Sequence, residues 1–480
     1  MLFLDIETDE DRLVCVGQAV DDGPVADDPS LVSPVRARLA DADEVVVTHS
    51  GYDARFLHFQ EGALIAAQQH DTQVMAWLAN ENTPLDLAYL AQRYLGITLD
   101  KTLQKMAGTA PYSDIAAYCR KDVEVTRKLY YMLRGKLQQD GLWDYFLQTE
   151  APFTKVLRDM EFNGLAVNLD HTSKLADIYR NKRAQAESTL GVGLPPDFNP
   201  RSPLHVSKYL ASEKFTVPGR IPVEQGSYDL DVLAGDAIDP EGDVRDMPVG
   251  RFVTVKHGRK WDTGFWVAKG RGYIGGANAT FQSIDRPSLM DNTNLATDPW
   301  VQDYMEYKKY DKLLGTYLEV FPVRARNGRI YGRFNQTGTA TGRLSSSEPN
   351  LQNIPSRGVE GVEIRDLFKG NLVVGDFSQL EPRLMAHFSQ DPGMLAAFAR
   401  GEDIYDAIAT KVGVSRGVAK TLVLAMSYGA GPEKVAQTLR LNGHPVSQAQ
   451  SRTYLYDLQR EFKVYFNWRE RIIADSKRTG

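Results

Sequence analysis

The sequence lacks long apolar stretches. No run is long and apolar enough to cross a membrane, and Asp5 and Glu7 interrupt the apolar start, so we expect no signal peptide. The two cysteines, Cys15 and Cys119, are too few for a disulfide scaffold and form no metal-ligand cluster. Internal repeats, low-complexity tracts and coiled-coil heptads are missing too. These absences exclude membrane-spanning, disulfide-rich and repeat proteins, and predict a cytoplasmic chain, in the host cytoplasm if viral.

Charge is unevenly distributed along the 480 residues. Residues 1–150 contain 13 Lys and Arg against 24 Asp and Glu, a net charge of −11. The whole chain carries −6, which leaves +5 for the rest. A mildly basic back half agrees with a surface that holds DNA phosphates, although charge alone fits two solvated surfaces equally well.

Local patterns divide the chain into segments. Short apolar runs between Asp, Gly and Pro clusters predict strands within residues 1–50, and helical periodicity predicts helices through 84–146. An amphipathic helix that begins near Ala151 is expected to stop at Asn163-Gly164. Residues 214–300 predict an irregular insertion with short strands. Helical patterning returns from 301, a β-rich stretch follows, and residues 391–480 are mostly helical in pattern.

The first group of candidate catalytic residues is acidic. Asp5 and Glu7 are two residues apart, so both carboxylates point to one face of a strand. Close like charges repel unless a cation lies between them, which predicts a divalent-metal site. Asp53 follows an apolar run, and Asp122 lies one helical turn after Tyr118. Hydrolysis of a phosphodiester uses hard cations, which carboxylate oxygens bind, and the Tyr118 hydroxyl is a candidate for orienting water.

In this order the five residues resemble the DEDDy family of 3′→5′ exonucleases, over residues 1–148. The resemblance implies a ribonuclease-H-like domain with two Mg²⁺ ions, or Mn²⁺ in their place, held by Asp5, Glu7, Asp53 and Asp122. Asp71-Thr72, before a short helix, also fits. His49 stands where the family usually has Asn, which affects the expected positioning of the DNA end. The competing interpretation is the same fold with surface acids and no activity.

A polar string covers residues 335–355. Its density of amide, hydroxyl and guanidinium donors suits phosphate and sugar oxygens, although composition alone does not separate it from a long exposed loop. The string closely resembles the template-primer motifs of family A DNA polymerases, the bacterial DNA polymerase I type. By that resemblance the DNA-binding residues are Thr341, Arg343, Gln352, Asn353 and Arg365.

An apolar run, Asn371 to Gly375, precedes Asp376 and predicts a strand whose exit presents that carboxylate. The segment resembles motif A of the same family, so Asp376 is expected to bind both catalytic Mg²⁺ ions. Glu381 is expected to crowd the sugar 2′ position and select deoxyribonucleotides. Pro382 replaces the usual Leu, a change that the first turn of a helix tolerates. A buried salt-bridge acid is the alternative for Asp376.

A row of residues four apart follows. Such spacing puts the side chains along one face of a helix, which without further context is usually an exposed face. The row resembles motif B, the O helix of the fingers. The implied nucleotide-binding residues are Glu381, Tyr405, Arg416, Lys420, Leu424 and Tyr428. Arg416 and Lys420 would bind the triphosphate, with Lys420 also a candidate general acid. Leu424 stands for the usual Phe or Tyr, and Tyr405 for the usual His.

One family motif is missing. The second metal-binding Asp belongs to a His-Asp-Glu hairpin, and the only His-Asp is His70-Asp71, followed by Thr72. The final residues resemble a segment upstream of that hairpin. With one carboxylate of the pair missing, the two-metal site is expected to be incomplete. We also expect no upstream 5′ nuclease domain, an architecture that resembles bacteriophage replicative polymerases.

The predicted fold is α/β and α+β multidomain: a ribonuclease-H-like exonuclease followed by an incomplete polymerase right hand. The expected domains are an exonuclease at 1–148, a thumb region at 149–330 with the insertion at 214–300, a palm part at 331–390, and fingers at 391–480. The expected partners are primer-template DNA, dNTPs and a C-terminal fragment that supplies motif C, with a processivity factor as a further candidate and no membrane.

The predicted function is a DNA-directed DNA polymerase with a 3′→5′ proofreading exonuclease, split or truncated in this chain. A second interpretation is an exonuclease whose polymerase half only clamps DNA. A third is a non-catalytic nucleic-acid-binding protein. The four exonuclease acids argue against the third. Asp376, Arg416, Lys420 and Tyr428 argue against the second, because a clamp does not need nucleotide-binding side chains.

Overall fold

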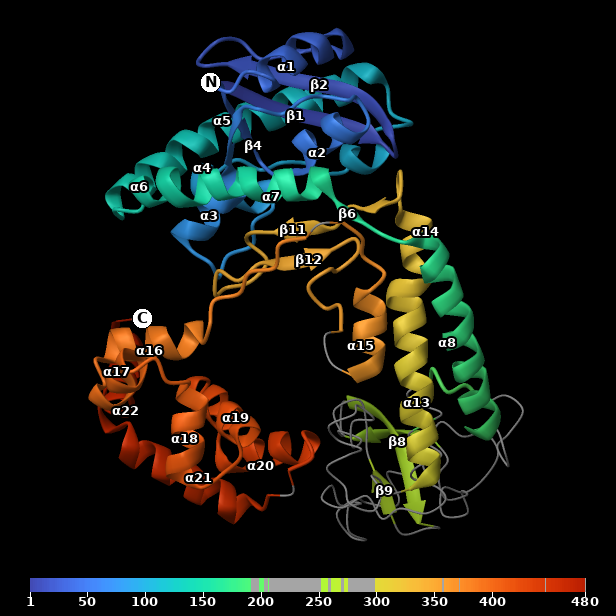
Figure 1. Ribbon diagram of the computed structural model, residues 1–480. Coiled ribbons are helices and arrows are strands. Elements are labelled where there is room, and N and C mark those ends of the chain that lie inside the picture. The colour runs from blue at the N-terminus through green and yellow to red at the C-terminus, as the bar shows by residue number, and fades with distance from the viewer. Residues whose placement is uncertain are drawn as a thin grey trace. The chain divides into compact units, whose positions relative to one another are not determined.

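The computed structural model describes residues 1–190, 198–202, 206, 252–257, 260–268, 272–274, 298–355, 358–370, 372–444 and 446–479. The chain forms two compact units, which are described separately (Figure 1). Unit 1 joins Met1–Asp177 to Leu313–Leu372, and unit 2 joins Ile178–Lys312 to Val373–Gly480. The predicted insertion at 214–300 lies mostly outside the described residues.

The exonuclease region of unit 1 is built on a five-stranded mixed sheet. Its spatial order is β3-β2-β1-β4-β5. The strands are β1 (Leu2–Asp9), β2 (Arg12–Val20), β3 (Ala26–Asp27), β4 (Val45–Thr48) and β5 (Gln68–Asp71). β1 runs antiparallel to β2 and parallel to β4, and β4 runs parallel to β5. The strands expected within residues 1–50 are therefore confirmed, and β1 lies at the centre of the sheet.

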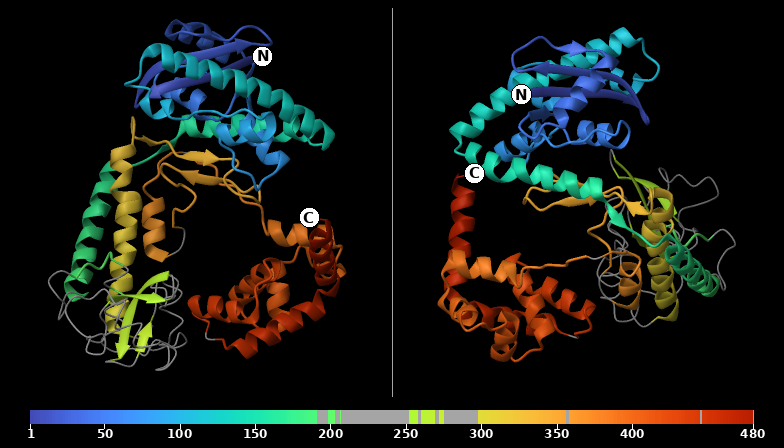
Figure 2. Two further views of the ribbon diagram at one scale, coloured as in Figure 1. Left: turned by 180° about the vertical axis from the view of Figure 1, so that it is seen from behind. Right: turned by 45° about the horizontal axis from the view of Figure 1, so that its top comes forward.

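Helices cover this sheet. The longest, α5 (Tyr112–Gln139), packs on β1 and β2, and Figure 2 shows it crossing the sheet. The others are α1 (Val32–Leu39), α2 (Tyr52–Phe59), α3 (Thr72–Ala79), α4 (Leu87–Leu95), the 3-10 helix Leu103–Met106, α6 (Trp143–Tyr145), the π-helix Phe146–Glu150 and α7 (Ala151–Asn163). Phe3 and Leu129 are fully buried between β1 and α5. α7 ends as expected at Gly164, whose φ of 58° favours glycine.

The segment Leu313–Leu372 folds against the exonuclease region within unit 1. It holds a π-helix (Leu314–Leu318), α14 (Val320–Arg324), β10 (Arg329–Ile330), β11 (Arg333–Asn335), β12 (Ser345–Ser347) and α15 (Gly358–Arg365). β10 pairs with β6 (Leu165–Ala166), and β11 lies beside α7. The carboxylate of Glu161 accepts from the backbone N–H of Phe334 at 2.6 Å, and the Trp77 indole donates to the Thr339 carbonyl at 3.1 Å. Polar contacts therefore join the two segments.

Unit 2 contains two groups of helices. α8 (Leu169–Leu190), which begins in unit 1, and α13 (Pro299–Leu313) are linked by an ion pair from Arg183 to Asp311 at 3.1 Å. The strands Phe252–His257, Lys260–Ala268 and Gly272–Ile274 form an antiparallel sheet, β7-β8-β9. The later helices are α16 (Leu380–Ser389), α17 (Pro392–Ala399), α18 (Ile404–Val412), α19 (Arg416–Ser427), α20 (Pro432–Leu441), α21 (Gln448–Glu461) and α22 (Lys463–Thr479). They share one apolar core, which confirms the helical prediction for 391–480.

The strand expected before Asp376 is wrong for this structure. Residues 372–377 have no regular structure, and Val373 and Val374 are 101% and 89% exposed. A strand is stable only when a neighbour satisfies its backbone N–H and C=O groups. No strand among the described residues pairs with this segment. Its apolar sequence has β propensity, but no described strand lies beside it to form the backbone hydrogen bonds of a sheet.

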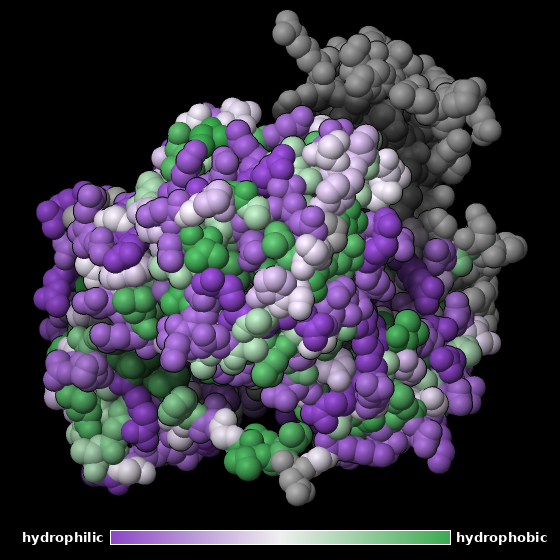
Figure 3. All heavy atoms as spheres, turned by 90° about the horizontal axis from the view of Figure 1, so that it is seen from above, coloured by the Kyte–Doolittle hydropathy of each residue, from purple (hydrophilic) through white to green (hydrophobic). Residues whose placement is uncertain are grey.

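No helix in the described part of the chain could span a bilayer. Figure 3 shows hydrophilic and hydrophobic residues interspersed over one face.

Candidate active sites

The exonuclease acids come from two elements that pack directly on each other. Asp5 and Glu7 lie on the same side of β1, and Asp122 faces them from α5. Each of these three side chains offers a ligand oxygen within 4.8 Å of the others. Tyr118, one turn before Asp122, is also buried. The structure thus brings together four of the five predicted residues through the contact of α5 with the central strand.

Asp53 approaches the same group from α2. It lies in the first turn of that helix, is 5% exposed, and accepts a hydrogen bond from the backbone N–H of Ile6 in β1. Its charge helps to raise the pKa of Asp5, so the two carboxylates interact. Asp53 is not one of the three acids within 4.8 Å of each other. The fourth acid therefore borders the close group and does not belong to it.

Burial and mutual repulsion make these carboxylates hard to ionise. Burial, with a contribution from Asp122, raises the pKa of Glu7 to about 8. Burial raises the pKa of Asp53 to about 7, and burial with the charge of Asp53 raises the pKa of Asp5 well above its usual range. Oδ1 of Asp122 is buried without a hydrogen-bond partner among the described residues. Such a set of oxygen donors fits a hard divalent cation.

Lys101 is part of this site, and sequence reasoning missed it. Its Nζ donates to Oδ2 of Asp122 and to the hydroxyl of Tyr118, both at 2.7 Å. Lys101 lies between α4 and the 3-10 helix Leu103–Met106, outside regular structure. No spacing or periodicity marks a lysine in such a segment, so the contact could be found only in three dimensions.

His49 and Asp71 form hydrogen bonds at the start of the neighbouring helix α3. Nδ1 of His49 lies 2.9 Å from the hydroxyl of Thr72, and burial lowers the pKa of His49 to about 4, so this imidazole is neutral near pH 7. Asp71 caps α3 by accepting from the backbone N–H of Gln73 at 2.7 Å, which confirms the predicted short helix. The effect of His49 on a DNA end stays a prediction.

A cleft of about 480 Å³ in unit 1 is lined by Tyr52, the residue before Asp53, but by none of the four acids. Aromatic rings and arginines line much of it: Tyr52, Phe56, Phe59, Tyr331, Arg55, Arg324, Arg326 and Arg333. Tyr52 precedes Asp53, and its hydroxyl lies 2.8 Å from that of Thr8 at the end of β1. The side chains of Arg324 and Arg326 are exposed and form no hydrogen bond or ion pair with the described residues. Rings and unpaired guanidinium groups suit bases and phosphates.

The predicted template-primer residues lie on the surface of unit 1. The side chains of Thr341, Arg343, Gln352, Asn353 and Arg365 are all exposed. β11 and β12 flank the loop that carries the first two. The side chain of Asn350 accepts from the backbone N–H groups of Gln352 and Asn353, which fixes the turn after β12. The string is thus an exposed, hydrogen-bonded surface of donors.

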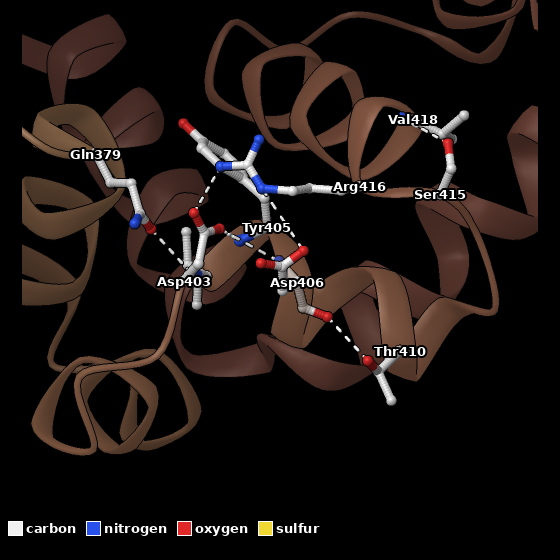
Figure 4. A network of polar contacts seen from close by, with 9 residues as sticks. Gln379, Asp403, Tyr405, Asp406, Thr410, Ser415, Arg416 and Val418 are labelled. Atoms are coloured by element: carbon white, nitrogen blue, oxygen red, sulfur yellow. Dashed lines mark hydrogen bonds and ion pairs between the residues drawn. The ribbon is translucent and has the colours of Figure 1, made fainter.

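The predicted nucleotide-binding residues gather around α19 in unit 2. Arg416 pairs with Asp403 at 2.6 Å, and its guanidinium lies 5.4 Å from the ring centroid of Tyr405 (Figure 4). Nζ of Lys420 lies 5.9 Å from the same ring. Asp403 also caps α18, which holds Tyr405 in place. Two cations on the exposed face of α19 therefore lie near the ring of Tyr405, which belongs to α18.

The other end of this helix meets the start of α16. The Tyr428 hydroxyl donates to Oε1 of Glu381 at 3.0 Å. Leu424 is half-buried one turn before Tyr428. The predicted row is confirmed for Arg416, Lys420 and Leu424, and Tyr428 follows the last residue of α19. Gln379, just before α16, accepts from the backbone N–H of Ile404 at 2.9 Å. Neither the Asp403 pair nor the Glu381 contact could be predicted, because each joins residues far apart in sequence.

Asp376 stands apart from these groups. Its carboxylate is exposed on the unpaired segment and forms no hydrogen bond or ion pair with the described residues. No close group of three or more metal-ligating side chains in the described ranges includes it. The buried salt-bridge alternative is therefore wrong, and the expected metal-binding role of Asp376 stays a prediction.

Comparison with known proteins agrees with both halves of this geometry. Residues 4–138 match the family described as 3′-5′ exonuclease, and residues 277–480 match DNA polymerase family A. The chain belongs to DNA polymerase family A and carries a 3′-5′ exonuclease domain. The exonuclease match spans all four acids, and the family A match spans motifs A and B.

The relatives of this family A chain are distant. DNA polymerase I of Treponema pallidum is 25% identical over 502 aligned positions, which cover 99% of this chain and 44% of that protein. The thermostable DNA polymerase I of Thermus aquaticus is 36% identical over 197 positions, covering 38% of this chain and 23% of that protein. The chain thus spans less than half the length of these relatives.

A solved structure shares the fold. It is the POL domain of Pol1 from M. smegmatis in complex with DNA primer-template and dNTP. The match has a TM-score of 0.73 at 21% identity and covers 100% of this chain and 76% of that one.

We expect the stability of the metal-free protein to fall as pH rises. A carboxyl whose folded-state pKa is raised disfavours folding increasingly between its unfolded and folded pKa values, here between about 4.5 and about 8 for Glu7. The thermal midpoint in EDTA should therefore decrease over this range, and excess Mg²⁺ should restore it. Glu7→Gln should weaken the pH dependence of the free energy of unfolding, with a difference from the wild type on the order of a few kcal/mol at pH 8.

The matched control is Glu81→Gln, at an exposed position, which should keep the wild-type slope. If the thermal midpoint changes with pH equally in Glu7→Gln and the wild type, Glu7 ionises normally in the folded protein.

Proposed function

We propose that this family A chain removes nucleotides from DNA 3′ ends and contributes the template, primer and nucleotide surfaces of a DNA-directed DNA polymerase. The observation that carries the first part is the close group of Asp5, Glu7 and Asp122 bordered by Asp53. Buried carboxylates with no cation are unfavourable, and this arrangement has no structural use that a hydrophobic core would not serve better.

In the proposed mechanism, the four acids would hold two divalent ions, with Mg²⁺ expected and Mn²⁺ as the alternative. When bound, such ions lower the pKa of water and stabilise the departing oxygen of a phosphodiester. The Tyr118 hydroxyl then orients the attacking water, because it lies on the same helix face as Asp122. Tyr118 keeps its proton for this task, since burial and the charge of Asp122 raise its pKa above the usual value.

The cleft lined by Tyr52 is the proposed path of the single-stranded 3′ end. Bases would stack on Tyr52 and Tyr331, and phosphates would meet Arg324 and Arg326. The hydrogen bond between Tyr52 and Thr8 connects this cleft to the strand that carries Glu7.

The polymerase part of the proposal rests on unit 2. Arg416 and Lys420 would bind the triphosphate, and Glu381 with Tyr428 would border its sugar and base. Asp376 would bind both catalytic ions, together with a second carboxylate outside the described residues. The exposed apolar residues Val373 and Phe377 support a further palm segment, from the same polypeptide or another, that pairs with this stretch.

The exonuclease proposal is tested with single carboxylate variants. Asp5→Ala and Glu7→Ala should each slow excision of a 5′-labelled primer by roughly three orders of magnitude, because about 4 kcal/mol of transition-state stabilisation is lost. Asp114→Ala, an exposed acid in the first turn of α5, is the control and should excise normally. Wild-type rates in Asp5→Ala would place the chemistry elsewhere.

The path proposal is tested by removing two positive charges. Arg324→Ala with Arg326→Ala should weaken binding of a short single strand and reduce the slope of log K against log salt by about 1.4, since each phosphate contact contributes about 0.7. Lys136→Ala with Lys155→Ala removes the same charge from lysines already paired with Asp140 and Asp159, and should change little. If both double variants have the same slope of log K against log salt, the cleft is excluded as the path of the single strand.

The polymerase proposal predicts what the 480-residue chain does by itself. With Mg²⁺ and a primer-template, it should shorten the primer both with and without dNTPs, because Asp376 belongs to no close group of three or more metal-ligating side chains among the described residues. The measurement is a gel of 5′-labelled primer. Extension by the pure chain would mean that another carboxylate completes the site.

A further inference from the structure

Lys101 places a positive charge where a divalent ion is expected. Its Nζ is 2.7 Å from Oδ2 of Asp122 and 2.7 Å from the Tyr118 hydroxyl, and it lies 5.0 Å from the ring centroid of Tyr118. Asp122 is 4% exposed in this ion pair, while Lys101 is 31% exposed. The ammonium therefore reaches a buried carboxylate from the solvent side.

This charge offsets a repulsion that the fold itself creates. One ligand oxygen from each of Asp5, Glu7 and Asp122 lies within 4.8 Å of the others, and the packing of α5 on β1 brings these side chains together. The positive charge of Lys101 acts on Glu7 as well as on Asp122, since it opposes the rise in the pKa of Glu7. Lys101 thus supplies one positive charge to the whole group.

The backbone of Lys101 is fixed, but its charged side chain can move away from Asp122. The backbone at its position is fixed, because the Asp100 carboxylate accepts from the Thr102 backbone N–H at 2.9 Å and from its hydroxyl at 2.7 Å. The side chain itself is a flexible four-carbon stem with no other hydrogen bond among the described residues. A short movement of the stem can withdraw the ammonium while its Cα stays in place.

We propose that Lys101 is a built-in counter-ion: its ammonium occupies the acid group when no divalent ion is bound and competes with the ions for Asp122. This inference rests on the proposed metal-dependent exonuclease. An ammonium and a divalent cation cannot both lie against Oδ2 of Asp122, because they repel each other strongly at such distances. Binding of the ions therefore requires Lys101 to withdraw.

Withdrawal has a second effect on the site. The Tyr118 hydroxyl accepts from Lys101 in the present structure. When the ammonium leaves, this hydroxyl becomes available to hold water, and the lysine charge remains close enough to meet a phosphate oxygen of the DNA end. Lys101 is thus a positioning residue that links loading of the ions to the availability of Tyr118.

The test measures Mn²⁺ binding to the full 480-residue chain without DNA, by titration calorimetry and by the electron paramagnetic resonance signal of free Mn²⁺. Lys101→Met keeps the length of the stem and removes the charge. It should bind Mn²⁺ at least about tenfold more tightly than the wild type, because one competing charge is lost. Lys121→Met, next to Asp122 in sequence but exposed and without an ion pair among the described residues, should bind like the wild type.

A second measurement covers the case in which Lys101→Met folds poorly. In EDTA its thermal midpoint should lie below that of the wild type, and saturating Mn²⁺ should raise it by more than it raises the wild type. Lys101→Gln, which keeps a hydrogen-bond donor without the charge, should show the same tighter binding. Equal or weaker Mn²⁺ binding in both Lys101 variants would overturn the inference.

A further control separates this inference from the proposed function. Asp5→Asn should bind Mn²⁺ much more weakly than the wild type. If the wild type itself binds no Mn²⁺, the metal-dependent exonuclease fails, and the inference fails with it. If the wild type binds and Asp5→Asn does not, the Lys101 variants alone decide the question.

Discussion

Repulsion among buried carboxylates is the constraint around which the exonuclease region is organised. β1 is the central strand: Asp5 and Glu7 pair with Gly17 and Cys15 of β2, and β4 pairs with β1 at Leu2 and Phe3. α5 then presses Asp122 against them through an apolar contact that includes Phe3 and Leu129. Hydrophobic packing thus offsets the electrostatic cost, and keeps the acids close together with or without a cation.

Unit 1 also contains the segment that carries the proposed template-primer residues. Residues 313–372 pack on the exonuclease region within this unit. Gln336 donates to the carboxylate and the backbone carbonyl of Glu150, and Glu161 holds both Phe334 and Arg55. Arg55 lies two residues after Asp53 in α2, so few contacts separate the loop after β11 from the exonuclease acids.

The sequence predicted what local rules control. Strand alternation placed Asp5 and Glu7 on one face of β1, and helical spacing placed Tyr118 and Asp122 on one face of α5. The spacing of four also correctly predicted that Arg416, Lys420 and Leu424 share a helix. The sequence could not predict Lys101, because a lysine in an irregular segment is ordinary until the fold brings it to Asp122. The strand before Asp376 was wrong for the opposite reason: β propensity was present, but a strand also needs a neighbour, and local sequence does not report one.

The hydrogen bond from Trp77 to the carbonyl of Thr339 gives the molecule an optical reporter at the junction of its two segments. Indole emission responds to the polarity and hydrogen bonding of its surroundings, so any separation of the template-primer loop from α3 would shift the fluorescence of this one residue. With the other five tryptophans replaced by phenylalanine, the loop could be followed in solution during DNA binding without attaching a dye.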